Sequence, residues 1–251
     1  MTLNWKKTLI VTIDILLAAY LALAVTAFNK PDESKQVCTQ VRVDITDNVV
    51  DGFLSAGEIK RILQRNKIYP LAKPMSAVDV RLIEETLRRS PFVDMVECHK
   101  AQNGLVCITL TQRMPIVRVK ADNGDDYYID NRGGVMPNTK YAGDLVVATG
   151  CVSKAYARKV LTPIGNFIVN DRFWRNQIVQ INVLHDGTME IVPRVGEHVV
   201  YLGLPTQVPE KLARLRKFYR YGLNKAGWNK YSYINLEFDN QIICKKKTKQ
   251  Q

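Results

Sequence analysis

The chain has 251 residues, of which 46% are hydrophobic and 24% are charged, a composition that is typical of a folded protein and excludes a mainly disordered one. Its net charge is +12, but four of its lysines lie within the last seven residues, so the remainder is less basic than the total suggests. No helix-turn-helix, zinc-finger or aromatic base-stacking motif accompanies this charge. A basic nucleic-acid-binding protein is therefore an alternative only, and we expect no nucleic acid among the partners.

An apolar segment over residues 8–28 dominates the N-terminal part, and Asp14 is the one charged residue in it. A helix of that length rises about 30 Å, which is the thickness of a bilayer core. We therefore predict a cytoplasmic head over residues 1–7, followed by an uncleaved transmembrane helix. The alternative is a cleaved signal peptide, because Lys6 and Lys7 precede the segment, although a signal core usually has only about 7–15 apolar residues.

Asp14 would lie inside the membrane in this prediction. A carboxylate there costs roughly 2.5–3.5 kcal/mol, which favours a partner helix, a polar cavity or protonation. Alternatively, the helix shifts along its axis so that Asp14 reaches the inner head groups. With the short basic head inside, everything after Asn29 is exported, which predicts a single-pass type II membrane protein.

Five cysteines are spread along the predicted exported part. They lack the paired spacing of a zinc site or of a dithiol redox motif, so we expect no metal site. An odd number leaves at least one thiol unpaired, and Cys98 and Cys107 flank a predicted hairpin turn that could bring them together. Buried free thiols are the interpretation that we favour. The five are Cys38, Cys98, Cys107, Cys151 and Cys244.

A polar connector over residues 29–36 leads into the pattern of a small α/β module. Ser55 and Glu58 have capping-box spacing at the start of one helix, and Ser76 is the expected cap of the next. These elements predict a two-layer βααββ module, which we place at residues 37–112. The expected elements are a strand over residues 37–45, helices over residues 55–66 and 76–90, and strands over residues 92–100 and 105–113.

Residues 113–244 are richer in strands, which turn signals separate. A helical stretch over residues 154–170 contains Pro163 and should therefore be bent or split. A second helix covers residues 208–223. We predict a larger, mostly antiparallel β domain with helices, then a basic tail over residues 245–251, and an α+β fold for the chain after its N-terminal helix.

The helix over residues 208–223 has one apolar and one basic face. We interpret the basic face as solvated and paired with occasional acidic residues, and an acidic partner is the alternative. Two final strands follow, over residues 231–238 and 241–244. The basic residues of the helix are Lys211, Arg214, Arg216, Lys217 and Arg220.

No constellation of side chains points to catalysis. The histidines, at positions 99, 185 and 198, each stand alone among strand residues, and His99 would point away from its neighbour Cys98. The glycine-rich turns do not lead from a strand into a helix as phosphate loops do. The turn at Asn123–Gly124 is better explained as a hairpin tip than as a calcium site. We therefore expect no enzyme activity, no catalytic, cofactor-binding or metal-binding residues, and no small-molecule substrate.

Three motifs resemble the FtsQ/DivIB family of bacterial cell-division proteins. The stretch SPFVDMVECHKAQNGLVCITLTQRMPIVRV resembles the end of that family's POTRA module and the entry to its next domain. YYIDNRGGVMP resembles the first hairpin of its β domain, and YSYINLEFDNQIIC its final strand pair. The resemblance covers nearly the whole chain after Asn29. POTRA modules also occur in periplasmic assembly and secretion factors, which are the alternative, but those carry tandem copies or a long barrel.

The resemblance implies a scaffold in the inner membrane at the division septum, with its C-terminal part in the periplasm. It implies binding to FtsB- and FtsL-like proteins, control of the synthase pair FtsW and FtsI, and FtsK as a further partner. The family's docking site lies on the last strands and the preceding helix, where a partner strand can pair with a free sheet edge. The matched residues are Tyr233, Leu236, Glu237, Phe238, Asp239, Asn240 and Ile242.

Within this set, Phe238 takes the place of an aromatic anchor. Core packing is the alternative for Leu236 and Phe238, and it could account for one of the two. Glu237 stands where relatives often carry arginine, so the partner should differ in charge there or make no contact. We interpret the lysines at the end of the chain as residues that prevent unwanted pairing with other strands.

Overall fold

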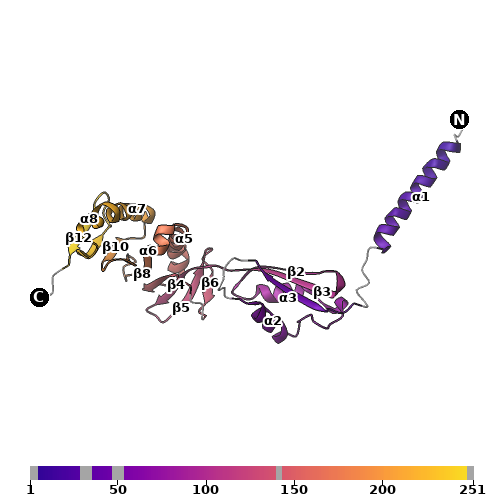
Figure 1. Ribbon diagram of the computed structural model, residues 1–251, viewed down its shortest axis with the longest axis horizontal. Helices are drawn as coiled ribbons and strands as arrows, with labels where there is room; N and C mark the ends of the chain where they lie inside the picture. Colours follow the sequence, from indigo (N-terminus) through magenta and orange to yellow (C-terminus); the bar gives the residue numbers. More distant parts are fainter. Residues whose placement is uncertain (1–4, 29–35, 47–53, 140–142, 248–251) are drawn as a thin grey trace. The chain divides into compact units, whose positions relative to one another are not determined.

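A computed structural model of the chain describes residues 5–28, 36–46, 54–139 and 143–247 (Figure 1). The chain forms two compact units, and each is considered by itself. One comprises residues 1–44, 56–87 and 96–109, and the other residues 45–55, 88–95 and 110–251. Residues 1–4 of the predicted head, 29–35 of the connector and 248–251 of the tail lie outside the described residues.

The first element is the helix α1 (Trp5–Phe28). Its large apolar side chains from Leu9 to Leu23 are exposed, and so is Asp14. Within the residues that the structure describes, no helix is both long enough and apolar enough to cross a membrane. The transmembrane span predicted for residues 8–28 is therefore not confirmed.

A three-stranded sheet in the order β1-β3-β2 follows, with two helices (Figure 1). The amides of Thr39 and Thr46 donate to the carbonyls of Gly104 and Leu110, so β1 and β3 run parallel. The helices bury apolar residues one turn apart, as the sequence predicts. The elements are β1 (Gln40–Ile45), α2 (Ala56–Arg65), the 3₁₀ turn η1 (Met75–Ala77), α3 (Val80–Arg88), β2 (Val93–Lys100), η2 (Gln102–Gly104) and β3 (Leu105–Gln112).

The start of α3 differs from the prediction. Ser76 lies in η1, and the cap is Asp79, whose Oδ1 accepts a hydrogen bond of 3.1 Å from the amide of Leu82. Aspartate is as good a cap as serine, and the amide three residues after it is the one that a cap satisfies. The choice of Ser76 was wrong because the chain forms a separate 3₁₀ turn before the helix begins.

The larger unit contains a nine-stranded sheet in the order β12-β11-β10-β9-β8-β7-β4-β5-β6. Most neighbouring strands are antiparallel, but three pairs are parallel: β4 with β7, β7 with β8 and β10 with β11. The sheet is therefore mixed, and β12 and β6 are its edges. Its strands are β4 (Pro115–Ala121), β5 (Asp126–Asp130), β6 (Val135–Pro137), β7 (Val146–Gly150), β8 (Ile178–Val183), β9 (Met189–Pro193), β10 (Val199–Gly203), β11 (Tyr231–Asn235) and β12 (Ile243–Lys246).

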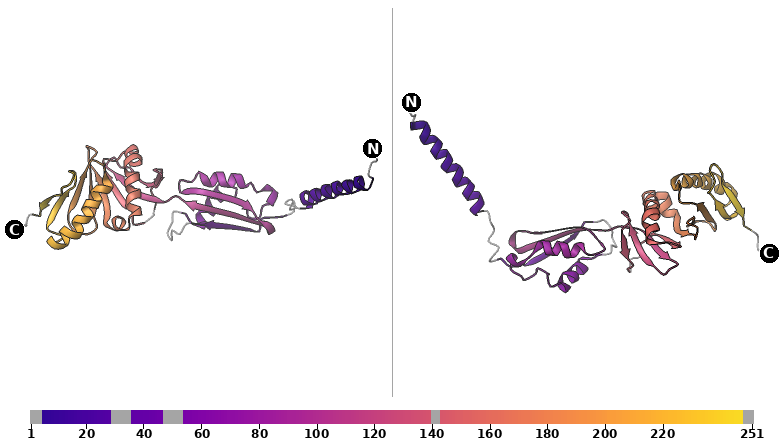
Figure 2. Two further views of the ribbon diagram at one scale, coloured as in Figure 1. Left: turned by 90° about the horizontal axis from the view of Figure 1, so that it is seen from above. Right: turned by 180° about the vertical axis from the view of Figure 1, so that it is seen from behind.

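The helices of this unit lie against the sheet, and their apolar side chains join those of the strands in one core (Figure 2). Two of the helical stretches contain a π turn, which has a wider ring of hydrogen bonds than an α-helix. The stretch with Pro163 is not split, because Leu161 and Thr162 keep right-handed helical dihedral angles and η3 continues directly into α5, where the proline lies in the first turn. The helical elements are α4 (Lys154–Tyr156), the π turn η3 (Ala157–Leu161), α5 (Thr162–Asn170), α6 (Arg172–Gln177), α7 (Val208–Phe218), the π turn η4 (Tyr219–Leu223) and α8 (Asn224–Ala226).

The predicted hairpin around Asp130 is present as β5 and β6. The Asp130 side chain accepts hydrogen bonds from the amides of Arg132 at 3.0 Å and Gly134 at 2.6 Å. It also pairs with the Arg113 guanidinium, Oδ2 to Nη2, at 2.6 Å, and Asp130 is buried. A charged group that is buried must be paired in this way, so Asp130 fixes the turn to the strand connection that precedes β4.

Candidate functional site

The C-terminal edge of the large sheet is formed by β11 and β12. Strand β11 pairs in parallel with β10, and the connection between them contains α7. Strand β12 then pairs antiparallel with the other side of β11, with Ile243 opposite Asn235 and Cys244 opposite Ile234. Among the residues that the structure describes, β12 has no second neighbour. Its outer amides and carbonyls are therefore free to pair.

The final strands are shorter and shifted relative to the prediction. Strand β11 ends at Asn235 rather than at Phe238, because the Asn235 side chain accepts a hydrogen bond of 2.7 Å from the amide of Glu237 and turns the chain. Strand β12 begins at Ile243, and so Lys245 and Lys246 of the predicted tail lie within it. Most of the predicted docking residues consequently lie in the loop between the two strands.

One of the seven predicted docking residues is in the core, and another is half-buried against neighbouring side chains of the sheet. Leu236 is 0% exposed and belongs to the core, so core packing is the correct interpretation for it. The Tyr233 ring stacks on that of Tyr201 with a centroid distance of 6.2 Å, and its hydroxyl lies 3.5 Å from Glu190 Oε1. Burial, and then the charge of Glu190, raise the pKa of Tyr233 to about 12. Tyr233 is thus half-buried against Tyr201 and Glu190.

The other five residues form the loop itself. Phe238 is 47% exposed, although an aromatic ring of this size is usually buried. Glu237, Asp239 and Asn240 are also exposed, and Asn240 has a φ of 60°, which amide side chains tolerate in turns. Ile242 packs partly against the core. The loop therefore presents one aromatic ring among polar side chains beside the β12 edge.

The loop is held by α7, the helix whose basic face we predicted to be solvated. Arg214 of α7 donates to the backbone oxygens of Leu236 at 2.8 Å and Phe238 at 2.7 Å, and lies 4.0 Å from the Asp239 carboxylate. Lys211 is buried and donates to the carbonyls of Leu202 and Leu204. The interpretation of these two residues as a solvated face was wrong, because backbone carbonyls compete with water for both.

Burial, and then the nearby charge of Arg214, lower the pKa of Lys211. A hollow of about 420 Å³ lies where α7 meets the loop. Its lining mixes both charges and contains no large apolar side chain, so it suits polar contacts rather than the burial of an apolar ligand. The lining residues are Gln207, Glu210, Lys211, Arg214, Asp239 and Asn240.

All five cysteines are free. Burial raises the pKa of Cys98 to about 12, with smaller contributions from Glu84 and Cys107. The expectation that the histidines stand alone is wrong for His185, because its Nδ1 lies 2.8 Å from Cys151 Sγ. The two residues follow β8 and β7, whose parallel pairing brings their ends together.

The histidine at position 198 also has a partner. His198 is buried, and its Nε2 lies 2.8 Å from the Tyr219 hydroxyl. Burial lowers its pKa, which favours the neutral ring. In the described parts of the chain, no three His, Cys, Asp or Glu side chains are grouped so that they could hold a metal ion.

Comparison with known families supports the division of the chain into two domains. A model described as "POTRA-like domain" matches residues 36–111, and one described as "FtsQ/DivIB, C-terminal related" matches residues 114–245. None of the curated proteins compared with the chain matches it. The second family model alone covers more than half of the chain and includes every predicted docking residue. The resemblance found in the sequence is confirmed: the chain belongs to the FtsQ/DivIB family.

Proposed function

We propose that the chain is a cell-division scaffold that binds FtsB- and FtsL-like proteins through the free edge of β12. Membership of the FtsQ/DivIB family supports a role in cell division. The mode of binding rests on one observation, that β12 pairs with β11 and with no other strand in the described part of the chain. A partner segment could add a further strand there, with main-chain hydrogen bonds for affinity and side chains for specificity.

The other edge of the sheet is less suitable. Strand β6 has only three residues, and its central Met136 is buried. At β12, by contrast, two large apolar side chains are exposed, Phe238 in the loop before the strand at 47% and Ile243 in the strand itself at 49%. Exposed aromatic anchors of this kind carry much of the energy of protein interfaces. Because Arg214 already holds the backbone of the loop, the chain at Phe238 would lose little backbone freedom on binding.

The charges at the edge constrain the partner segment. Lys245 and Lys246 lie in β12 itself, so acidic side chains opposite them are favoured. Glu237 has the opposite sign and is exposed in the loop. The partner should therefore carry a neutral or basic residue near Glu237, or make no contact there.

The wider role follows from the family and from the sequence. Bound FtsB- and FtsL-like proteins would link the chain to the synthase pair FtsW and FtsI, with FtsK as a further partner. The proposal places the protein in the inner membrane at the septum, with its C-terminal part in the periplasm. The membrane location rests on the apolar sequence over residues 8–28, where Asp14 would pair with another helix or lie near the head groups.

Co-purification of the full-length chain with FtsB- and FtsL-like proteins from the same cell tests the proposal. Phe238→Ala and a chain cut before Gln241, which lacks β12, should both lose the partners. Met114→Ala is the matched control, because Met114 is also an exposed apolar residue but precedes β4 near the other end of the sheet. Unchanged capture by both edge variants would overturn the docking site. No capture by the unmodified chain would overturn the function.

A further inference from the structure

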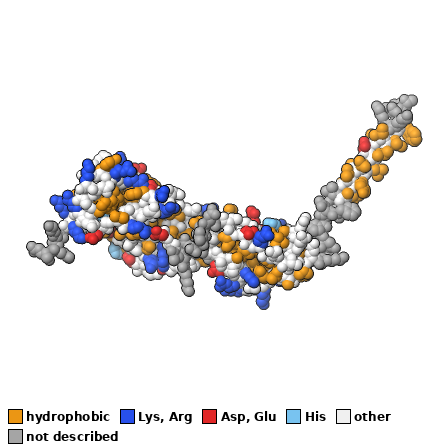
Figure 3. All heavy atoms as spheres, in the orientation of Figure 1, with side chains coloured by type: hydrophobic (Ala, Val, Ile, Leu, Met, Phe, Trp, Pro, Cys, Tyr) orange, Lys and Arg blue, Asp and Glu red, His pale blue; other side chains and the backbone are white. Residues whose placement is uncertain are grey.

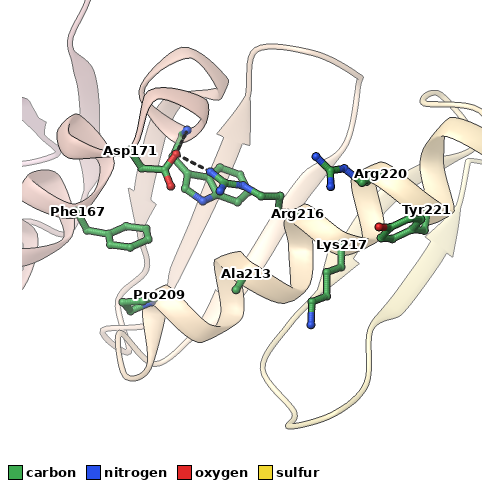
Figure 4. A pocket seen from close by; sticks show the side chains of 9 residues that line it. Phe167, Asp171, Pro209, Ala213, Arg216, Lys217, Arg220 and Tyr221 are labelled. Atoms are coloured by element: carbon green, nitrogen blue, oxygen red, sulfur yellow. Dashed lines mark hydrogen bonds and ion pairs between the residues drawn. The ribbon is translucent and has the colours of Figure 1, made fainter.

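A second surface of the large unit lies on the other side of α7 (Figure 4). There, α7 and η4 form one wall of a groove of about 470 Å³, and α5 and α6 form the other. This groove is defined by its lining residues and is called the helix groove below. The residues are Phe167, Asp171, Trp174, Pro209, Ala213, Arg216, Lys217, Arg220 and Tyr221.

The helix groove is separate from the β12 edge. Successive residues of an α-helix are about 100° apart, so Arg214 and Arg216 point to opposite sides of α7. Arg214 donates to the loop before β12, whereas Arg216 donates to Asp171 between α5 and α6. One helix therefore separates two surfaces, and occupation of one leaves the other accessible.

The groove has an apolar interior. Pro209 and Ala213 of α7 face Phe167 of α5, whose ring points into the open space in Figure 4. Trp174 is buried behind them, while Tyr221 is 64% exposed at the far end. Clefts with such a lining accept apolar side chains.

Arg216 makes several contacts within the wall of the groove. Its guanidinium bonds to Asp171 Oδ1 at 2.5 Å and lies over the rings of Phe173 at 4.6 Å and Trp174 at 5.4 Å. Asp171 also accepts hydrogen bonds from the amides of Phe173 and Trp174. Burial by itself would raise the pKa of Asp171, but these amides and Arg216 together lower it, so it stays ionised. The charge of Arg216 is thus balanced within the fold.

The other two basic side chains of the groove have no acidic partner among the described residues. Lys217 and Arg220 are exposed, and among the described residues neither side chain has an ion-pair or hydrogen-bond partner. Figure 3 shows Lys and Arg side chains beside exposed apolar side chains in the region of α7 and α8. Two free positive charges next to an apolar slot complement an acidic ligand with an apolar group.

We propose that the helix groove binds a short acidic segment of a partner protein, with one large apolar side chain between α5 and α7 and carboxylates on Lys217 and Arg220. The volume is suited to one or two side chains, and its concave shape favours a peptide. A lipid surface or a nucleic acid binds to basic residues that are spread over a flat or extended surface. Neither of them requires an apolar slot. The proposal does not depend on strand addition at β12.

The test is selection from a library of random twelve-residue peptides on the immobilised full-length chain, with Ala213→Trp as the counter-selection. Ala213 is exposed in the groove, so a tryptophan there would fill the slot without disturbing the core. Peptides that bind only the unmodified chain should carry net negative charge and at least one aromatic or large aliphatic residue. Enriched peptides that are neutral or basic, or that bind both chains equally, would overturn the proposal.

Affinities of one enriched peptide then test the charges. The double variant Lys217→Glu and Arg220→Glu should bind at least about tenfold more weakly, because attraction is replaced by repulsion. Lys225→Glu in α8, an exposed lysine outside the lining, is the matched control and should bind as the unmodified chain does. The chain cut before Gln241 should also retain the peptide, which distinguishes this site from the β12 edge. Equal binding by the double variant would contradict the proposal.

Two further probes separate the peptide from other anions. Phosphatidylglycerol vesicles and a single-stranded oligonucleotide are titrated against the unmodified chain and Ala213→Trp. We expect Ala213→Trp to bind the vesicles and the oligonucleotide as the unmodified chain does. If Ala213→Trp weakened binding to either probe as strongly as it weakened binding to the peptide, the groove would be a site for that polyanion and the proposal would be wrong.

Discussion

Arg214 Nη1 donates a hydrogen bond of 2.7 Å to the backbone oxygen of Phe238, which is 24 residues further along the chain. The same guanidinium donates to Leu236, so the loop before β12 is attached to α7 on both sides of Glu237. The backbone that carries the exposed ring of Phe238 is therefore held against α7. Preorganisation of this kind reduces the entropy cost of binding.

Arg214→Ala should release this loop. Two hydrogen bonds from a charged donor would be lost, which we expect to cost about 1.5–3 kcal/mol. Urea unfolding followed by the fluorescence of Trp174 and Trp228, both in the large unit, would measure the loss. Hydrogen exchange at residues 236–240 should speed up in the same variant. Lys217→Ala, an exposed residue of the same helix, should change neither measurement, and a loop whose exchange is unchanged by Arg214→Ala would refute the assignment.

His198 should make the stability of the large unit depend on pH. Its pKa is lowered in the fold by burial, so the unfolded chain binds a proton more readily. The stabilising contribution is complete above about pH 6.5 and declines as the pH falls, by up to about 1.4 kcal/mol per pH unit. Unfolding free energies between pH 7.5 and 5 should therefore fall less steeply in His198→Gln. The exposed His99→Gln serves as the control, and equal slopes in the two variants would exclude this role of His198.

Asp130→Ala should be among the most destabilising changes in the large unit. It would leave Arg113 and the amide of Gly134, which are both partly buried, without this partner, which we expect to cost about 1.5–3 kcal/mol. Asp126→Ala removes an exposed ion pair with Arg118 and should cost less than about 1 kcal/mol. Thermal unfolding of both variants compares the two losses. Similar losses would mean that the ion pair of Asp130 is not stronger than a surface pair.

Cys151 should react with iodoacetamide faster than the other cysteines. Burial raises the pKa of three of the other thiols, to about 12 for Cys98, and so keeps them protonated. Cys151 is partly exposed, and its Sγ lies 2.8 Å from Nδ1 of His185, an arrangement in which a histidine activates a neighbouring thiol. Peptide mass spectrometry after brief labelling at pH 8 would rank the thiols. His185→Ala should slow the labelling of Cys151 and His99→Ala should not; a faster reaction at any other cysteine would contradict the prediction.

Much of the architecture could be predicted because local signals agreed with the fold. The apolar positions one turn apart in α2 and α3 mark their buried faces, and the aspartate-to-glycine pattern marks the hairpin of β5 and β6. The order of strands in the large sheet could not be predicted in this way. Its three parallel pairs join segments that are distant in sequence. The alternation of apolar and polar residues shows that a segment is a strand, but it does not show which other strand pairs with it.

The candidate site was predicted in part for the same reason. Its position at the C-terminal strands came from the motif, but alternation suggested that β11 continues to Phe238, and the turn made by Asn235 ends it earlier. Arg214 and Lys211 were missed because a basic side chain on a helix usually faces water. Their partners are backbone carbonyls, which have no signature in the sequence.

The π turn of η4 has a consequence for insertions and deletions. A π turn contains one residue more than an α-helix needs, so removing one residue from 219–223 would allow a regular helix to continue. The helix after the deletion would keep its orientation, because the wider ring of the π turn accommodates the extra residue, but the end of the helix groove formed by Tyr221 would change. Arg214 precedes the turn and would keep its bonds to the loop. Relatives that differ in length at this point could therefore exchange one binding partner while they retain the other.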